Sequence, residues 1–317
     1  MKRKDLVLAL AVVMGWGTNF TFMKLGLDGI PSMLMVAMRY LFVMVPAIFF
    51  VKKPNISFKY IILYGLTVGV GQFACMFYAI EIGMPAGLAS VIMQLQAFIT
   101  PALAAIFLRE KLNFRQLTGF AIAFIGLITI GFASVTGDII SVPLKAFLIT
   151  ICAPVFWSIS NIISRIASDE LVDMGEEPDT FGMVVWSSIV PPIPMFVLSL
   201  IFHRPSVVID SIRNLNLVSV FSVLFLAYIA TLFCYGAWNY LIFKYPLSVI
   251  SPTSLLVPVF GLLVSRVVLS EQLSLMQWIG VSFLLLGLIV TNLNLKRFFH
   301  YGSLPMDSCE ENNPENH

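Results

Sequence analysis

Long apolar stretches alternate with short polar segments along nearly the whole chain. Each stretch approaches the roughly 20 apolar residues that a bilayer-spanning helix needs. The pattern therefore predicts an all-α membrane protein with ten transmembrane helices and no soluble catalytic domain. The predicted helices lie near residues 6–26, 32–51, 59–80, 86–108, 116–134, 145–165, 181–202, 217–242, 247–268 and 274–293.

The composition supports a membrane location. Of the 317 residues, 59% are hydrophobic and 11% are charged, and the mean hydropathy is +0.93; soluble domains carry about 25% charged residues. The first apolar stretch is long and lacks a small-x-small cleavage site at its end, so we expect an uncleaved helix rather than a signal peptide. The polar segment 302–317 is expected to be disordered.

The second half of the sequence repeats part of the first. Residues 85–128 align without a gap to residues 246–289, 161 positions later, and eleven of the 44 pairs are identical. Leu and Ile matches carry little weight in so apolar a chain, whereas matched Pro, Glu, Gln and Gly residues are not expected from composition. The informative pairs are Pro85/Pro246, Glu110/Glu271, Gln116/Gln277, Gly119/Gly280 and Gly126/Gly287.

Earlier landmarks repeat at a shorter offset of 141, because Trp16 matches Trp157 and Lys24 matches Arg165. We therefore expect a first repeat over residues 5–134, with spans 1–5, and a second over residues 145–295, with spans 6–10. Many membrane transporters are built from such duplicated units.

Lysine and arginine residues predict the orientation. With the N-terminus inside, 13 of the 19 Lys and Arg residues lie on the cytosolic side and five on the other, and Arg39 lies within a span. The positive-inside rule then places both termini in the cytoplasm. Because each repeat has five spans, the second copy is expected to be inverted across the membrane. The basic segment 109–115 then lies inside, and its uncharged counterpart after Ser270 lies outside.

Several motifs recur together: Trp16-Gly-Thr-Asn-Phe with Lys24, Pro-x-Gly-Leu-Ala-Ser at 85–90, Leu-Arg-Glu-Lys-Leu at 108–112 with Gly119 and Gly126, and the copies around Trp157, Glu271, Gly280 and Gly287. Together they resemble the EamA family of drug/metabolite transporters over about residues 5–295. The resemblance implies a secondary transporter of the bacterial inner (plasma) membrane, most similar to exporters of O-acetylserine and cysteine. One departure is Ala97, thirteen residues before Glu110, where the family often has the proline that Pro258 supplies before Glu271.

Polar and aromatic residues within the predicted spans mark a candidate transport pathway, because such groups usually face the bundle interior or a water-filled cavity. Asn19 follows Trp16 by three residues and Asn161 follows Trp157 by four, which places each pair on one helical face. Any one of them could instead hold helices together by a hydrogen bond. The residues predicted to contact substrate are Trp16, Asn19, Arg39, Gln72, Tyr78, Gln94, Gln96, Trp157, Asn161, Tyr235, Trp238, Asn239 and Ser254.

Arg39 is the only basic residue well inside a predicted span, and its counterpart in the second repeat is Ser187. An unpaired charge there costs a few kcal/mol, so it must meet carbonyls, water or an anion. Arg39 either helps to hold a substrate carboxylate or tethers neighbouring helices, and both interpretations stay open. Lys24 and Arg165 lie near span ends, where long side chains can extend to the interface.

A site of amides, aromatic rings and few charges suits a neutral zwitterion such as an amino acid. Its ammonium group can lie over a Trp or Tyr ring, and its carboxylate can meet Arg39 or a helix N-terminus. We expect export of small metabolites such as cysteine or O-acetylserine by alternating access; a drug or aromatic-metabolite exporter is the alternative. No Asp or Glu lies in the middle of a predicted span, so transport is either facilitated or coupled to protons through an edge residue such as Glu81.

The sequence lacks the motifs that would indicate an enzyme, a metal site or a nucleotide-binding site. There is no HExxH motif and no phosphate-binding loop, and His203, His300 and His317 lie in predicted loops or in the tail. We expect no enzyme, no cofactor and no metal. The expected partners are a small-molecule substrate and membrane lipid, without nucleic acid, in a monomer or homodimer. The repeated residues should hold the scaffold, and the substrate should meet positions that differ between the copies: Gln94/Leu255, Gln96/Val257 and Arg39/Ser187.

Overall fold

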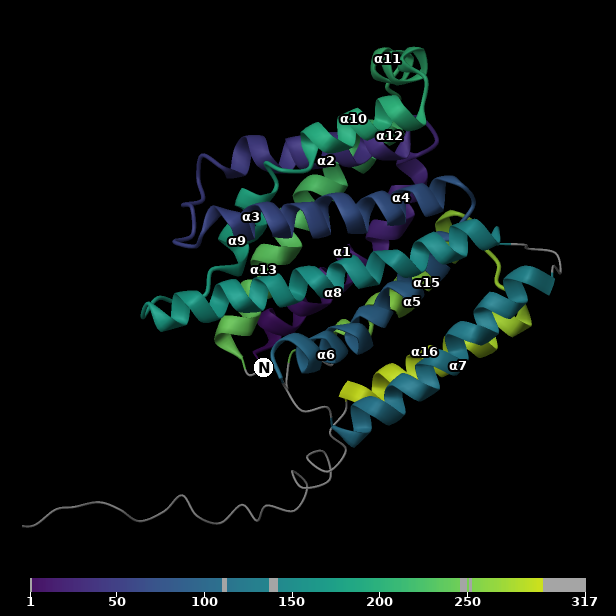
Figure 1. The fold of residues 1–317 in the computed structure, drawn as a ribbon. Coiled ribbons are helices and arrows are strands. Elements are labelled where there is room, and N and C mark those ends of the chain that lie inside the picture. Colours follow the sequence, from purple (N-terminus) through teal and green to yellow (C-terminus); the bar gives the residue numbers. More distant parts are fainter. Residues whose placement is uncertain (1, 110–112, 137–141, 246–249, 251–252, 293–317) are drawn as a thin grey trace, which may run out of the picture.

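Apolar helices packed side by side make up the described part of the chain, which contains no strand (Figure 1). The structure is a computed structural model, and it describes residues 2–109, 113–136, 142–245, 250 and 253–292. Segments η1 and η3 are π-helical and η2 is a 3₁₀ turn. In chain order the elements are α1 (Arg3–Gly26), α2 (Ser32–Ala47), α3 (Phe58–Tyr64), η1 (Gly65–Gln72), α4 (Phe73–Glu81), α5 (Ala86–Ile92), η2 (Met93–Leu95), α6 (Gln96–Phe107), α7 (Phe114–Thr136), α8 (Leu144–Asp173), α9 (Thr180–Ser187), α10 (Pro192–Phe202), α11 (Pro205–Arg213), α12 (Leu217–Leu224), η3 (Phe225–Phe233), α13 (Cys234–Lys244), α15 (Val257–Val268) and α16 (Leu275–Asn292).

Among the described residues, six continuous helices are long and apolar enough to cross a membrane, and the bent pair α9–α10 makes a possible seventh. Three shorter apolar helices, α2, α15 and α16, lie where other spans were predicted. The multi-pass helical architecture is therefore confirmed, whereas the count of ten spans stays a prediction. The six long spans are Arg3–Gly26, Phe58–Glu81, Ala86–Phe107, Phe114–Ala133, Leu144–Asp173 and Leu217–Leu241.

Two segments predicted as loops are partly helical. α8 continues past residue 165 to Asp173, and the Arg165 guanidinium lies 3.1 Å from the Asp169 carboxylate, one helical turn later. Such pairs stabilise an exposed helix by a few tenths of a kcal/mol. The predicted loop 203–216 contains α11, which begins at Pro205, a favoured first position for proline, and buries Val208. The predicted tail 302–317 lies outside the described residues.

The seventh predicted span is broken rather than continuous. α9 ends at Ser187 and α10 begins at Pro192, with a bend of 45° between them. Consecutive prolines, Pro191 and Pro192, lack the amide N–H that would continue the hydrogen-bond ladder of α9. The break lies against η1, where a Cβ on Gly65 would come within 2.7 Å of the Ser187 carbonyl oxygen.

Local features recur at matching positions in the two halves. π-Helical segments interrupt both the third and the eighth predicted span, as η1 and η3. Arg109 and Ser270, 161 positions apart, both have positive φ values, of 56° and 55°, which are uncommon for residues other than glycine. The repeated Gln116 and Gln277 each accept a hydrogen bond from the backbone N–H three residues earlier, at 2.8 and 2.9 Å. Each thus caps the start of its helix.

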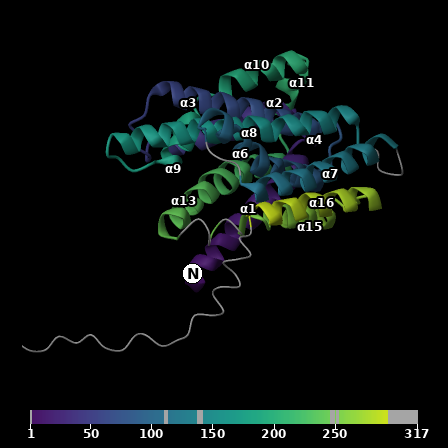
Figure 2. The same ribbon diagram turned by 60° about the horizontal axis from the view of Figure 1, so that its bottom comes forward.

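The repeated glycines lie where α7 and α16 pack against each other, antiparallel (Figures 1 and 2). A Cβ on Gly119 would lie 2.7 Å from the carbonyl oxygen of Gly287, and one on Gly126 would lie 2.5 Å from that of Gly280. Only glycine permits so close an approach. Replacing each glycine by its counterpart 161 positions away turns the pair Gly119/Gly287 into Gly280/Gly126, which is the symmetry expected of two related repeats.

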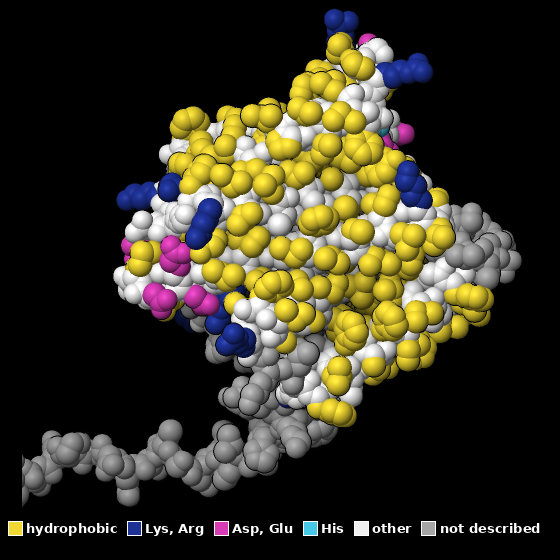
Figure 3. All heavy atoms as spheres, in the orientation of Figure 1, with side chains coloured by type: hydrophobic (Ala, Val, Ile, Leu, Met, Phe, Trp, Pro, Cys, Tyr) yellow, Lys and Arg dark blue, Asp and Glu magenta, His cyan; other side chains and the backbone are white. Residues whose placement is uncertain are grey.

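Figure 3 shows hydrophobic side chains over the middle of one face, with charged side chains gathered toward its margins. We call the end where α8 ends and α9 begins the basic end, and the end where α4 ends and α5 begins the Glu81 end; they lie at the left and right of Figure 1. The Glu81 end is tightly packed: all seven residues of α5 are buried, and Met23, Phe77 and Ile80 are at most 1% exposed.

Candidate functional site

A cavity of about 360 Å³ lies among the helices of both halves. Its volume falls within the range of small-molecule sites. Its lining residues come from elements that are distant in sequence: α1, α2, α3, η1, α4, η2, α6, α8, α9, η3, α13 and α15, with Ser254 just before α15. Twelve of the thirteen residues predicted to contact substrate line it: Trp16, Asn19, Arg39, Gln72, Gln94, Gln96, Trp157, Asn161, Tyr235, Trp238, Asn239 and Ser254.

Tyr78 is the exception and lies away from the cavity. Its ring packs against Phe202 with centroids 5.4 Å apart, and its hydroxyl oxygen lies 3.4 Å from Lys145 Nζ, a donor. Tyr78 follows the cavity-lining Met76 by two residues, which turns it to the opposite face of α4. The presence of an aromatic residue in a span did not reveal which face it occupies.

Ten further residues line the cavity that the sequence did not single out. Met23 follows Asn19 by four residues and therefore shares its helical face, a spacing that could have identified it. Tyr64 and Thr180 carried no comparable signal, because each lies near the start of its span. The ten are Phe20, Met23, Tyr64, Phe73, Met76, Met93, Ser164, Thr180, Ala230 and Val257.

Arg39 is only 3% exposed, and two of its three guanidinium nitrogens are held in place. Nη2 and Nε donate to Thr231 Oγ1 at 2.9 and 3.3 Å, and that hydroxyl in turn donates to the carbonyl of Leu226 in η3. The Phe73 ring lies 4.2 Å from the guanidinium carbon, as a cation–π contact. Nη1 has no hydrogen-bond partner, and no Asp or Glu occurs among the described residues that line the cavity.

Two amide oxygens on the same cavity share this lack of a partner. Asn19 Oδ1 and Gln72 Oε1 are buried and accept no hydrogen bond, while Asn19 Nδ2 lies 4.0 Å from the weak acceptor Met23 Sδ. A buried polar atom left unpaired costs about 1–3 kcal/mol. One cavity thus collects an unpaired cationic donor and two unpaired acceptors.

Aromatic rings form another wall of the cavity. The Trp16 ring lies 5.5 Å from that of Tyr235 and 5.3 Å from that of Trp238, and Trp16 Nε1 donates to the Ala230 carbonyl at 3.1 Å. These contacts join α1 to η3 and α13. On the α8 side, Asn161 donates to Gln96 Oε1 at 3.4 Å and to a threonine hydroxyl of α6 at 3.2 Å. Both walls therefore present fixed polar and aromatic groups.

The cavity extends toward the basic end and stops before the Glu81 end. Thr180, which lines it, follows directly on the exposed residues 172–179, which comprise the end of α8 and the loop after it. In the other direction the last lining residues are Met23, Met76 and Met93, each at most 2% exposed. The packed side chains of α4 and α5 close that side.

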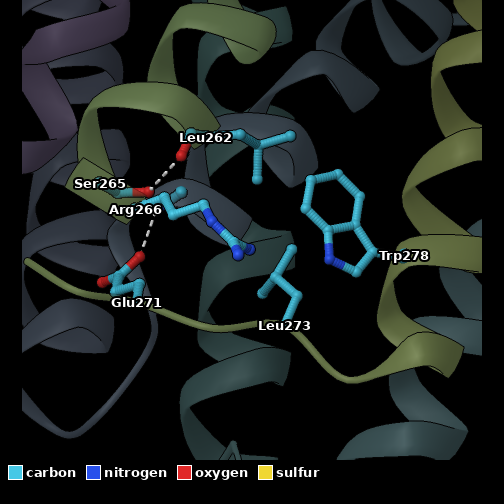
Figure 4. Close-up of a pocket in the computed structure, with 7 residues that line it drawn as sticks. Leu262, Ser265, Arg266, Glu271, Leu273 and Trp278 are labelled. Atoms are coloured by element: carbon cyan, nitrogen blue, oxygen red, sulfur yellow. Dashed lines mark hydrogen bonds between the residues drawn. The ribbon is translucent and has the colours of Figure 1, made fainter.

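The repeated glutamate lies outside the cavity. Glu271 accepts hydrogen bonds from the backbone N–H groups of Ala86 and Gly87 at 2.7 and 2.9 Å, at the start of α5. Anionic side chains are favourable there because these N–H groups have no partner within the helix. Figure 4 shows Glu271 at a narrow pocket beside Arg266 and Trp278. Its counterpart Glu110 lies outside the described residues.

A second ionisable group, Glu81, lies at the end of α4. Its carboxylate accepts from the Ser32 hydroxyl at 2.6 Å and from the Ser32 backbone N–H at 3.3 Å, and it lies 3.2 Å from His203 Nε2. The sequence placed His203 in a loop and gave no indication of its contact with Glu81. Among the described residues no cluster of His, Cys, Asp and Glu could hold a metal ion.

Comparisons with known proteins agree with this architecture. A model of the EamA-like transporter family matches residues 3–132 and 144–293. Proteins of Salmonella typhimurium and Escherichia coli K12, each named "Probable amino-acid metabolite efflux pump", are 39% and 37% identical, over 92% and 93% of this chain and 95% and 97% of their own. A solved crystal structure with 14% identity superposes with a TM-score of 0.61 over 94% of this chain and 100% of that one. That likeness concerns the fold alone.

Proposed function

The chain belongs to the EamA-like transporter family, and we propose that it exports small amino-acid-type metabolites, such as cysteine or O-acetylserine, through the bacterial inner membrane. Family membership makes it a membrane transporter and not an enzyme. The two relatives named as amino-acid metabolite efflux pumps support the direction of transport and the class of substrate.

The observation that carries the proposal is the convergence of twelve predicted polar and aromatic residues on one cavity. Polar side chains are costly within the apolar part of a membrane protein and persist where they line a pathway. A mixture of amides, indoles and one guanidinium can hydrogen-bond a small polar metabolite and exclude bulk solvent. The cavity is also large enough for an amino acid and small enough to enclose one.

Alternating access between two inverted repeats is part of the same proposal. The matched positive φ values, the matched π-helical segments and the paired glycines of α7 and α16 support repeats over residues 5–134 and 145–295. Inverted repeats permit two mirror-related states in which one end or the other is open. The excess of Lys and Arg at the basic end supports a cytoplasmic location for that end and for both termini.

A drug or aromatic-metabolite exporter is the second candidate, and the aromatic wall favours it. Trp16, Tyr235 and Trp238 offer ring faces and edges on which an aromatic compound can stack. Amino-acid and aromatic substrates would compete for one cavity, so a single competition assay separates the two candidates.

The test is transport by purified protein in proteoliposomes. We expect uptake of labelled, reduced L-cysteine and of O-acetyl-L-serine, inhibited by small neutral amino acids more strongly than by tryptophan or cationic dyes. The Trp16→Ala variant should lose most of this uptake. Trp278→Ala, a substitution of a half-exposed tryptophan outside the cavity, should retain it.

Absence of amino-acid uptake in sealed vesicles that still transport an aromatic compound would reject the proposal in favour of the second candidate. An imposed pH gradient that changes the initial rate would identify proton coupling, and an unchanged rate would identify facilitated export.

A further inference from the structure

The cavity contains three buried polar atoms without partners, and they differ in charge character. We infer that the substrate is a zwitterionic α-amino acid with an uncharged side chain, whose carboxylate binds Arg39 Nη1 and whose ammonium binds the amide oxygens of Asn19 and Gln72. This inference rests on the proposed function and specifies the chemistry of the same site.

The carboxylate assignment follows from how Arg39 is held. Thr231 occupies Nε and Nη2, and Phe73 lies against the guanidinium, so the plane of the group is fixed before a ligand arrives. Nη1 is buried and has no hydrogen-bond partner, on a residue that is 3% exposed. A buried guanidinium without an acidic partner favours an anion, and a charge-assisted hydrogen bond to a carboxylate is among the strongest available. Tethering and ligand binding are therefore complementary roles of different nitrogens.

The ammonium assignment follows from the two buried acceptors that have no hydrogen-bond partner. Asn19 Oδ1 and Gln72 Oε1 belong to side chains that are 8% and 5% exposed, on α1 and η1. An ammonium group donates three hydrogen bonds and accepts none, so it complements a pair of amide oxygens. The neighbouring ring of Trp16 offers a further surface for the cation.

The charge of the lining limits the side chain of the substrate. Arg39 is the only charged residue among the described residues of the cavity wall, so the wall balances one carboxylate and no second ion. A basic or acidic side chain would bring an additional charge without a partner, which is costly in a low-dielectric site. Met23, Met76 and Met93 instead offer flexible apolar contacts for a short neutral side chain.

Competition with truncated analogues tests each contact separately. The measured quantity is the concentration that halves uptake of labelled L-cysteine in proteoliposomes, for unlabelled L-cysteine, for cysteamine, which lacks the carboxylate, and for 3-mercaptopropionate, which lacks the ammonium. We expect both analogues to compete with wild type at least about ten-fold more weakly than L-cysteine, the factor that corresponds to one charge-assisted hydrogen bond.

The variants should remove these preferences one at a time. In Arg39→Gln, L-cysteine should bind no better than cysteamine, while 3-mercaptopropionate loses its affinity. The double variant Asn19→Leu with Gln72→Leu should bind L-cysteine no better than 3-mercaptopropionate. Arg213→Gln, on the exposed face of α11, is the matched control and should keep both preferences.

Thr231→Val tests the positioning of Arg39 without removing its charge. We expect a several-fold rise in KM with little change in the maximal rate, and recovery in Thr231→Ser, which restores the hydroxyl acceptor. Equal elution of all variants in gel filtration, with normal yield, separates these effects from misfolding.

Retention of the full preference for L-cysteine over cysteamine in Arg39→Gln would overturn the carboxylate assignment and leave the proposed function intact. Failure of wild type to take up any amino acid would reject the proposed function itself.

Discussion

The two ends of the molecule are held together by different kinds of contact. At the Glu81 end, the Glu81 and Glu271 carboxylates each bind the first backbone N–H groups of another helix, α2 and α5 respectively. Both helices have a proline at the N-cap position, which supplies no capping side chain of its own. At the basic end, the Asp5 carboxylate accepts from Tyr245 at 2.6 Å and pairs with Lys244 at 3.0 Å.

This difference parallels the shape of the cavity, which extends toward the basic end only. The Glu271 contacts at the Glu81 end lie over the fully buried helix α5, whereas the Asp5 contacts at the basic end adjoin the small apolar cluster of Ala9, Leu241 and Ile250. Two charge-assisted caps on buried helix ends are worth more than a partly exposed ion pair. Opening the Glu81 end should therefore be the more costly step of a transport cycle, and each end offers a carboxylate with which to test this.

Glu271→Ala should have the largest effect. The substitution leaves the N–H groups of Ala86 and Gly87 unpaired at the start of a fully buried helix. Losing two hydrogen bonds to a charged group should cost about 3 kcal/mol of stability. Thermal unfolding in detergent measures the loss, and the exposed neighbour Gln272→Ala is the control, expected to change stability by less than about 0.5 kcal/mol. An equal stability of both variants would show that the Glu271 cap does not hold this end closed.

Gly119→Ala and Gly126→Ala should have the next largest effect, and the two variants should lose similar amounts of unfolding stability. Gly119 lies nearer the basic end and Gly126 farther along α7, yet both face a glycine carbonyl of α16 across a similar gap. Forcing a methyl group into either contact should cost about 1–3 kcal/mol. Similar shifts in thermal unfolding would show that the α7–α16 pair does not distinguish the ends. A large difference would contradict the symmetry inferred from the paired glycines.

The repeated residues show what the sequence could predict. Identical Gln and Gly residues in one register indicated a scaffold, and the structure has Gln116 and Gln277 at helix starts and the glycines in one helix contact. Twelve of the residues that line the cavity were also predicted, because polar groups within an apolar span usually face the bundle interior or a water-filled cavity. Both inferences rest on residue types and their positions along the chain and do not require knowledge of which helices touch.

Contacts between segments that are distant in the chain could not be predicted from the sequence. Nothing near Arg39 in the sequence points to Thr231, which accepts its hydrogen bonds from the other half of the chain. The pairing of Glu81 with His203 is equally remote, because it forms where the ends of two spans meet. Tyr78 was misplaced for a related reason, since composition reveals that a residue lies in a span but not which neighbour covers it.

Glu81→Gln should change how readily the Glu81 end opens more than it changes the unfolding stability of the protein. The amide keeps the shape of the side chain but removes the charge that binds Ser32 and lies beside His203. If the substitution destabilises the closed state by about 1 kcal/mol, the population in which the Glu81 end is open rises roughly five-fold. The measurement is the rate at which a membrane-impermeant maleimide, added on the side where α2 begins, labels Met76→Cys in a cysteine-free background. Glu177→Gln, in the exposed loop at the opposite end, is the control, and equal rates in both variants would remove Glu81 from the closing contacts.

Asp5→Asn should have the smallest effect, because the cavity already extends to the basic end. The substitution weakens the contacts to Tyr245 and Lys244. Labelling of Asn239→Cys from that side should therefore rise less than two-fold, as expected for a partly exposed ion pair.

Hydrogen bonds from Lys244 to Tyr240 and Asp5 raise the pKa of the Lys244 ammonium above its usual value. A raised pKa keeps the ammonium charged until strongly alkaline pH, so the contribution of Lys244 is present throughout the neutral range and is lost only as the pH rises through that pKa. The ratio of labelling rates between Asp5→Asn and wild type should therefore be the same at about pH 6 and about pH 8. A labelling increase as large as that of Glu81→Gln would mean that both ends are held with similar strength, and the contrast between them would fail.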